Sequence, residues 1–203
     1  MSRYSTITTT THIPLLIFAA ALFPACGDYP AGRYDLLGGD RTAEVEKLLS
    51  DAQQGTAEDK YRLGLRYEKG MVVRQDLLEA VRWYQSAAMQ GNPDAQFKLC
   101  ELSDRGQGLP QDYQEAMRWC GLAADQGNRH AMFILGRHYH AAIGVPRDLV
   151  RAYMWYNLAS AYGADGGKSS RERLAIGMTP PQIAEAQKLA REWNVRMSRP
   201  IAE

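Results

Sequence analysis

The chain has 203 residues, of which 45% are hydrophobic and 23% charged, and its 24 basic and 23 acidic side chains leave a formal net charge of +1. This length and composition predict one globular domain or two small ones, and the aromatic content argues against disorder throughout. The near-neutral charge gives no reason to expect nucleic acid as the main partner. Three cysteines exclude a disulfide-dense miniature scaffold.

The N-terminal segment 1–26 has the pattern of an export signal. It holds Arg3, no acidic residue and an uninterrupted apolar run from Ile13 to Ala25. This run is too short to span a bilayer, which needs about 20 residues, but it has the length of the apolar core of a signal peptide. We therefore predict a signal peptide over residues 1–26 and export to the bacterial cell envelope, either to the periplasm or to a membrane.

Cys26 follows the apolar run directly. The segment LFPAC (22–26) resembles the lipobox of bacterial lipoproteins, in which a small residue precedes a lipidated cysteine. It departs from that pattern because Leu22 lies one place too early and Pro24 is unusual before the small residue. Lipidation of Cys26, simple cleavage nearby and an uncleaved anchor are three alternatives. In each case we expect the chain to associate with a membrane only through this N-terminal signal or its lipid.

Two short segments separate the signal from the rest of the chain. Residues 27–40 contain four Gly, one Pro and three Asp, a composition that predicts a flexible tether. Residues 41–56 then predict an N-terminal capping helix. Ala52 and Gly55 fall in register with the repeat described next, but this segment lacks the tryptophan of that repeat.

An internal repeat follows. At a shift of 36 residues the same residue types coincide three times, in the sets Leu63, Leu99 and Leu135; Asp76, Asp112 and Asp148; Trp83, Trp119 and Trp155; and Gly91, Gly127 and Gly163. A fixed period between 20 and 50 residues is the pattern of stacked supersecondary units. It predicts three units, over residues 57–92, 93–128 and 129–166.

Each unit is predicted to hold two helices. In the first helix of unit 1, Leu63 and Tyr67 share one helical stripe, and Gly70 ends the helix. Asp76 is the expected N-cap of the second helix. The buried face of that second helix is predicted to consist of Ala80, Trp83, Tyr84, Ala87 and Ala88.

The C-terminal region predicts a cap. Thr179-Pro180-Pro181-Gln182 forms a helix-start pattern with proline in the first turn, and a helix from about 180 to 193 follows. We assign capping helices to residues 167–195 and a tail to residues 196–203. We expect Trp119→Ala to destabilise more than Trp193→Ala, because Trp119 lies in the central unit.

The segment YRLGLRYEKGMVVRQDLLEAVRWYQSAAMQGN (61–92) and its two copies resemble the Sel-1-like repeat family, a branch of the tetratricopeptide-like α-solenoids. The resemblance covers about residues 41–195, and the third copy carries the family's Gly-Val-x-x-Asp turn at Gly144, Val145 and Asp148. It implies an all-α fold, an α/α superhelical solenoid of helix-turn-helix repeats with a period of 36 residues. It also implies a scaffold with many potential partners, so it is specific for fold and not for function.

Cys100 and Cys120 replace glycine (Gly64, Gly136) and tyrosine (Tyr84, Tyr156) at their repeat positions. In tetratricopeptide-like hairpins these positions lie across the contact between the paired helices. The resemblance therefore implies a Cys100–Cys120 disulfide if the chain is exported. The alternative is a pair of buried free thiols.

The sequence offers little catalytic chemistry. It has no glycine-rich phosphate loop, no zinc-protease motif and no nucleophile-elbow motif. His130, His138 and His140 stand at helical positions i, i+8 and i+10, whereas zinc ligands on a helix usually stand at i and i+3 or i+4. We therefore expect solvated or edge-packed histidines, and we predict no catalytic residue, no cofactor and no metal.

The best candidate for a binding site is the outward face of the first helices, which we term the A-helix face. It comprises Glu58, Arg62, Leu65, Lys69, Asp94, Lys98, Glu101, Arg105, His130, Ile134 and Arg137. In solenoids of this kind that face lines the concave groove, so we expect it to bind a protein or peptide of mixed polarity. The alternative is a solvated face that satisfies itself through the pairs Glu58–Arg62 and Asp94–Lys98.

Three functions remain open from the sequence. The first is a non-enzymatic scaffold or adaptor that mediates protein–protein interactions in the cell envelope, with an unidentified partner. The second is an envelope enzyme, or a binder of β-lactams or similar cell-wall molecules, because some exported cysteine-containing relatives have been linked to β-lactam binding. The third is a structural subunit of a secretion or polysaccharide-export assembly. Charge reversal of Arg62, Lys98 and Arg137 is expected to weaken partner binding with little loss of stability.

Overall fold

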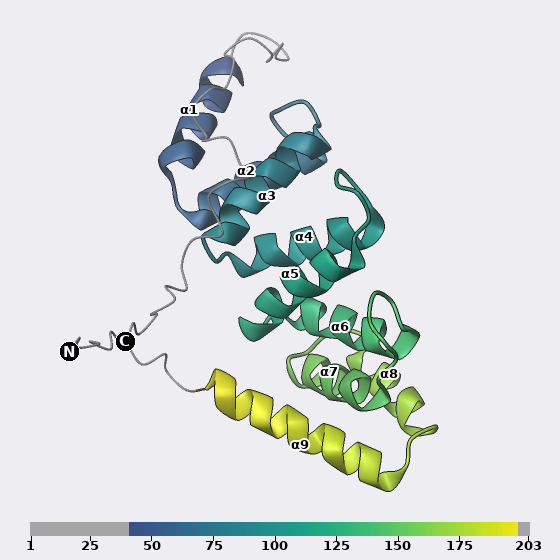
Figure 1. Cartoon of the computed structure of the whole chain (residues 1–203). Coiled ribbons are helices and arrows are strands. Elements are labelled where there is room, and N and C mark those ends of the chain that lie inside the picture. The colour runs from purple at the N-terminus through teal and green to yellow at the C-terminus, as the bar shows by residue number, and fades with distance from the viewer. Residues whose placement is uncertain (1–40, 199–203) are drawn as a thin grey trace, which may run out of the picture. The chain divides into compact units, whose positions relative to one another are not determined.

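The structure is a computed structural model and describes residues 41–198. The predicted signal peptide, the tether, Cys26 and residues 199–203 lie outside the described residues. Within residues 41–198 there are nine α-helices and no strand, which confirms the predicted all-α class (Figure 1). Their bounds are α1 Arg41–Gln54, α2 Ala57–Lys69, α3 Leu77–Met89, α4 Pro93–Arg105, α5 Tyr113–Asp125, α6 Arg129–Ala141, α7 Leu149–Ala161, α8 Gly167–Ala175 and α9 Pro180–Met197.

The helices pack in the order in which they follow along the chain. Three hairpins, α2–α3, α4–α5 and α6–α7, form the repeat units, and the second helix of each of the first two packs against the first helix of the next. Helix α1 packs against α2, and α8 and α9 both pack against α7. This arrangement is the predicted solenoid of helix pairs with a period of 36 residues.

The helix ends follow the predicted sequence signals. The side chains of Asp76, Asp112 and Asp148 accept hydrogen bonds from backbone N–H groups of the turns that follow them, and so cap α3, α5 and α7. Gly70 ends α2 with a left-handed φ of 67°. Ala142 adopts the same conformation after α6, with a φ of 57°, although it has a side chain.

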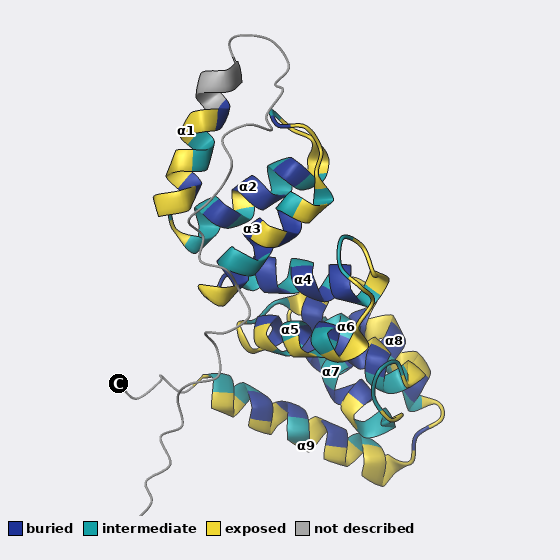
Figure 2. Ribbon diagram, turned by 45° about the horizontal axis from the view of Figure 1, so that its top comes forward, coloured by how far each residue is buried: buried dark blue, intermediate teal, exposed yellow. Residues whose placement is uncertain are grey.

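Small residues let the helices approach closely. The alanines at two equivalent positions of the second helices are fully buried in all three units, namely Ala80, Ala87, Ala116, Ala123, Ala152 and Ala159. Figure 2 shows the buried residues along the sides of the helices that face their neighbours. One hairpin cannot bury such a face alone, so the stacked neighbours are part of its core.

The C-terminal cap extends the core of the third unit. Helix α9 begins at the predicted helix-start pattern and continues to Met197, beyond the predicted end near residue 193. The indole nitrogen of Trp193 donates to Asp125 Oδ1 at 3.2 Å, and its rings lie edge-on to Trp155 and Tyr162. Helix α9 thereby connects α7 with the end of α5.

Helix α9 also changes the outward face of α7. Met154 and Leu158 of α7 are 8% and 1% exposed, whereas Arg118 and Leu122, at the same repeat positions of α5, are exposed. The arginine of the earlier unit is replaced by methionine at the position where the terminal helix packs. Within residues 41–198, no helix is both long and apolar enough to cross a membrane.

Candidate binding surface on the first helices of the repeats

The A-helix face lies at the surface, as its polar composition predicts. None of its eleven residues is buried: Arg62, Lys69, Asp94, Arg105, His130 and Arg137 are exposed, and Glu58, Leu65, Lys98, Glu101 and Ile134 are partly exposed. Helices α2, α4 and α6 carry these residues. Whether these residues form one continuous surface depends on the contacts between the three helices.

Polar contacts connect α2 with α4. The ammonium group of Lys98 lies 3.0 Å from Glu68 Oε1, and Asn92, the N-cap of α4, donates its amide to Glu58 Oε2 at 3.1 Å. The hydroxyl of Tyr84 donates to the second carboxylate oxygen of Glu68. Glu68 therefore joins its own hairpin to the next repeat.

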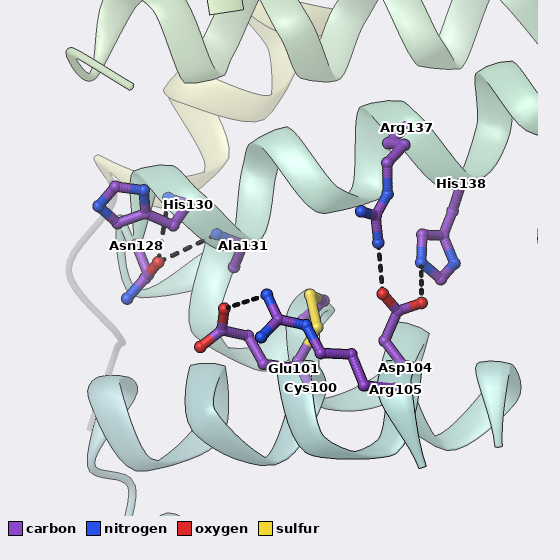
Figure 3. The surroundings of a disulfide bond; sticks show 10 residues. Cys100, Glu101, Asp104, Arg105, Asn128, His130, Ala131, Arg137 and His138 are labelled. Atoms are coloured by element: carbon purple, nitrogen blue, oxygen red, sulfur yellow. Dashed lines mark hydrogen bonds and ion pairs between the residues drawn. A yellow bond between two sulfur atoms is a disulfide. The ribbon is translucent and has the colours of Figure 1, made fainter. Parts of the chain in front are cut away.

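Equivalent contacts connect α4 with α6. Asp104, which stands at the repeat position of Glu68, accepts from the guanidinium of Arg137 and lies 2.8 Å from His138 Nε2 (Figure 3). Asn128, the N-cap of α6, donates its amide to Asp94 Oδ1 at 3.3 Å. The bridge from the Asn N-cap therefore recurs at both junctions between repeats, and at each junction the carboxylate of Glu68 or Asp104 also binds a cation of the next first helix, although Lys98 and Arg137 are not at equivalent repeat positions.

The charge pairs differ in part from those expected. The pair Glu58–Arg62 forms at 2.8 Å, but Lys98 contacts Glu68 and Glu101 of the described residues, and not Asp94. Because Lys98 and Arg137 each bind a carboxylate of the preceding repeat, reversing their charge would place two acids side by side. The contacts therefore predict a larger stability cost for this reversal than the sequence does, and a test of binding needs other cations.

The junction of repeats 1 and 2 is rich in carboxylates. Burial raises the pKa of Tyr61 to about 12, and the negative charges of Asp94, Glu58, Glu68 and Glu101 add to this rise. Burial also raises the pKa of Tyr84, and its hydrogen bond to Glu68 raises it further. Both hydroxyls therefore stay protonated at neutral pH, and that of Tyr84 donates to Glu68.

His138 is the polar residue that sequence reasoning placed wrongly, because it is fully buried and not solvated. Burial lowers the pKa of His138, and the charge of Asp104 opposes this while that of Arg137 adds to it. A signal existed in the sequence, since the residues 36 positions earlier and later, Leu102 and Leu174, belong to the buried stripe.

The two cysteines meet inside the second hairpin. The structure joins their sulfur atoms in a disulfide, with the Cα atoms 5.2 Å apart and both side chains fully buried (Figure 3). In the first hairpin the same positions hold Gly64 and Tyr84, and a Cβ atom on Gly64 would lie 2.6 Å from the tyrosine ring. The two positions do face each other, as the resemblance implied. Formation of the bond in the cell stays a prediction, because it requires an oxidising compartment.

The described residues include no group of three or more His, Cys, Asp or Glu side chains that could hold a metal ion. His138 is engaged with Asp104, while His130 lies at the start of α6 with its ring 5.7 Å from that of Phe97. The chemistry that remains on the surface is charge pairing and hydrogen bonding.

Comparison with known proteins agrees with this architecture. The sequence profile of the Sel1 repeat matches residues 57–92, 93–128 and 129–161, and the chain belongs to the Sel1 repeat family. Members of this family generally mediate protein–protein interactions and are typically scaffolds without catalytic activity. A search of curated proteins found no match.

Two solved structures are similar to this chain. A Sel1 repeat protein from Oxalobacter formigenes is 34% identical, with a TM-score of 0.59 over 64% of this chain and 98% of its own. A protective antigen with an SLR fold, present in uropathogenic Escherichia coli strains, is 27% identical, with a TM-score of 0.67 over 78% of this chain. The match spans only 36% of that longer antigen.

Proposed function

We propose that this chain is an exported scaffold of the bacterial cell envelope that binds a protein or peptide partner through its A-helix face. The observation that carries the proposal is the continuity of that face. Bridges from Glu68 to Lys98 and from Asp104 to Arg137 bring the first helices of three repeats together. Repeat proteins use such extended surfaces to bind other polypeptides.

Export is supported by two independent features. The N-terminal segment 1–26 has the composition of a signal peptide, and the paired cysteines of the second hairpin suit an oxidising compartment. Cys26 is the proposed site of lipidation, which would anchor the scaffold to a membrane. Loss of palmitate labelling in Cys26→Ser is the expected result, and a soluble periplasmic product of the wild-type chain would limit the proposal to export.

The binding surface is tested by neutralising cations whose loss leaves the bridges between repeats intact. The variant Arg62→Gln, Lys69→Gln and Arg105→Gln changes three exposed side chains of α2 and α4. We expect it to recover less partner in an affinity purification from membranes. Its stability should change by about 0.5 kcal/mol per site or less, because exposed substitutions have small effects.

The matched control neutralises three cations of the second helices, Arg82, Arg118 and Arg151, each of which lies within 3.4 Å of an acid three positions earlier. If the control variant loses the partner and the A-helix variant retains it, the binding surface is assigned to the wrong helices. Among residues 41–198 no observation favours an envelope enzyme, a β-lactam binder or a subunit of an export assembly over the scaffold.

A further inference from the structure

One position of the repeat holds a carboxylate in two units and lacks it in the third. In unit 1 the carboxylate of Glu68 accepts from the hydroxyl of Tyr84 and from Lys98 of the next first helix. In unit 2 Asp104 occupies the same position and accepts from Arg137 of the next first helix. In unit 3 the equivalent residue is His140, which carries no carboxylate.

The groups that would surround a carboxylate are nevertheless present in unit 3. Tyr156 is the equivalent of Tyr84, and its ring lies edge-on to that of His140 with the centroids 6.2 Å apart. Arg173 of α8 stands one repeat period after Arg137. Burial raises the pKa of Tyr156, and the positive charges of Arg137 and Arg173 act against that rise.

Two of these groups have no hydrogen-bond or ion-pair partner among the described residues. Among the described residues, none forms an ion pair with Arg173 or a hydrogen bond with the hydroxyl of Tyr156. The acid next to Arg173 in the sequence, Glu172, lies 3.9 Å from Arg171 instead. Arg173 is exposed and His140 is partly exposed, so a ligand can reach this position from solvent.

The surrounding helices favour a negative ligand. Within α6 and α8 the only acidic residue is Glu172, against the five cations Arg129, Arg137, Lys168, Arg171 and Arg173. In α4, by contrast, acids outnumber basic residues. The ring contact of His140 with Tyr156 and the register of Arg173 assign a hydroxyl, an imidazole and a guanidinium to this position of unit 3, and such groups match the hydrogen-bonding capacity of a carboxylate.

We propose that Tyr156, His140 and Arg173 form a binding site for a carboxylate of the partner polypeptide, in the place that Glu68 and Asp104 fill internally in the earlier repeats. The carboxylate belongs to an Asp or Glu side chain or to the C-terminus of the partner. This inference rests on the proposed scaffold function, because it adds a binding site for a negatively charged group of the partner at the α6–α8 end of the A-helix face.

The test uses small carboxylates, so that it does not depend on knowing the partner. The full chain is titrated with N-acetylglutamate α-amide, which carries a side-chain carboxylate, and with N-acetylglycine, which carries a terminal one. N-acetylglutamine amide is the uncharged control. NMR signals of the Arg173 guanidinium, the His140 ring and the Tyr156 ring report binding, and the probe that binds more tightly identifies the source of the carboxylate.

Two variants test the site. Arg173→Gln should weaken binding about tenfold or more, as expected for the loss of a charge-assisted hydrogen bond. His140→Glu supplies an internal carboxylate, as in unit 1, and should abolish binding while raising the thermal midpoint. Lys168→Gln removes a nearby exposed cation of α8 and should leave the dissociation constant within about twofold.

A wild-type chain that gives no saturable shift with either carboxylate overturns the inference, as does a His140→Glu chain that binds as tightly as wild type. The outcomes are separable from those of the scaffold proposal. If N-acetylglutamate α-amide binds but the α2–α4 variant keeps its partner, the carboxylate site stands and the A-helix assignment fails. If neither carboxylate binds but that variant loses its partner, the reverse holds.

Discussion

The first and second hairpins solve the same packing problem in different ways. In the first, Gly64 makes room for the ring of Tyr84, so that a small residue faces a large one across the helix pair. In the second, Cys100 and Cys120 face each other at the same two positions and are joined covalently. Both solutions fill the space between helices whose separation is set by the alanines around it.

The exchange also changes how the repeats are connected. The hydroxyl of Tyr84 binds Glu68 within the first hairpin, but Cys120 offers no hydroxyl to Asp104 in the second. Asp104 is instead bound by Arg137 and His138 of the next repeat. Glu68 therefore binds both its own hairpin and Lys98 of the next repeat, whereas the side chain of Asp104 binds only the next repeat among the described residues.

The largest expected effect concerns the tryptophans around the second repeat. Trp119 is partly exposed, with the guanidinium of Arg118 4.7 Å from its ring, whereas Trp193 of α9 is 5% exposed and bonded to Asp125. We expect Trp193→Ala to cost about 3–5 kcal/mol of unfolding free energy and Trp119→Ala to cost less. This order is the opposite of the one that central position in the sequence predicted.

Urea denaturation of both variants measures the difference. Trp193→Phe, which keeps an aromatic ring but removes the donor to Asp125, is the control and should lose only part of the stability. A larger loss for Trp119→Ala would show that central position in the array outweighs burial.

The next largest effect concerns the disulfide. The cysteines are separated by 20 residues, and closing a loop of this size stabilises a protein by about 3 kcal/mol in the chain-entropy account. Reductant should lower the urea midpoint of exported wild-type protein and leave that of the Cys100→Ala, Cys120→Ala double variant unchanged. Mass spectrometry after alkylation without reductant checks the bond directly, and two labelled thiols would refute it.

A smaller effect is expected from the glycine that complements Tyr84. In Gly64→Ala the added Cβ atom would lie 2.6 Å from a ring carbon, so the helices must separate or the ring must move, at a cost of about 1–3 kcal/mol. The control is Gly121→Ala in α5, where a Cβ atom meets nothing within 4 Å. That change should stabilise by roughly 0.5–1 kcal/mol, because alanine favours the helix interior. A change in unfolding free energy of the same sign for both substitutions would contradict the close approach at Gly64.

The sequence predicted the fold well because the period of 36 residues repeats its caps, its alanines and its tryptophans. It also predicted the face that carries the charges. It predicted the pair Glu58–Arg62 within one helix but not the partners between repeats, because a contact between positions about 30–34 apart, such as Lys98 with Glu68, depends on how two repeats stack. Nor did it predict the burial of His138, because histidine is usually exposed to solvent. Only the leucines at the equivalent repeat positions indicated a buried side chain.

The smallest effect should appear as a pH dependence of the junction between repeats 2 and 3. His138 is buried, its Nε2 faces Asp104, and a backbone hydrogen bond at Ile143 also favours the protonated ring. Its neighbours are the carboxylate of Asp104 on α4, the guanidinium of Arg137 on α6 and the ring of Tyr113 on α5, 6.0 Å away. Burial lowers the pKa of His138 below the value of about 6.5 that it has in an unfolded chain.

The unfolded chain therefore binds a proton at mildly acidic pH that the folded chain does not, so stability should fall as the pH decreases from about 7.5 through 6.5. The change is small because Asp104 favours the protonated imidazole and offsets part of the burial. His138→Leu, which installs the residue found at this position as Leu102 in the second repeat, removes the titrating group but keeps the Asp104–Arg137 pair. Between pH 7.5 and about pH 5.5 the urea midpoint of the wild type should fall more than that of His138→Leu. If leucine destabilises the junction, the two midpoints should therefore lie closer together at pH 5.5 than at pH 7.5. A variant that loses as much as the wild type would show that His138 does not link the stability of this junction to pH.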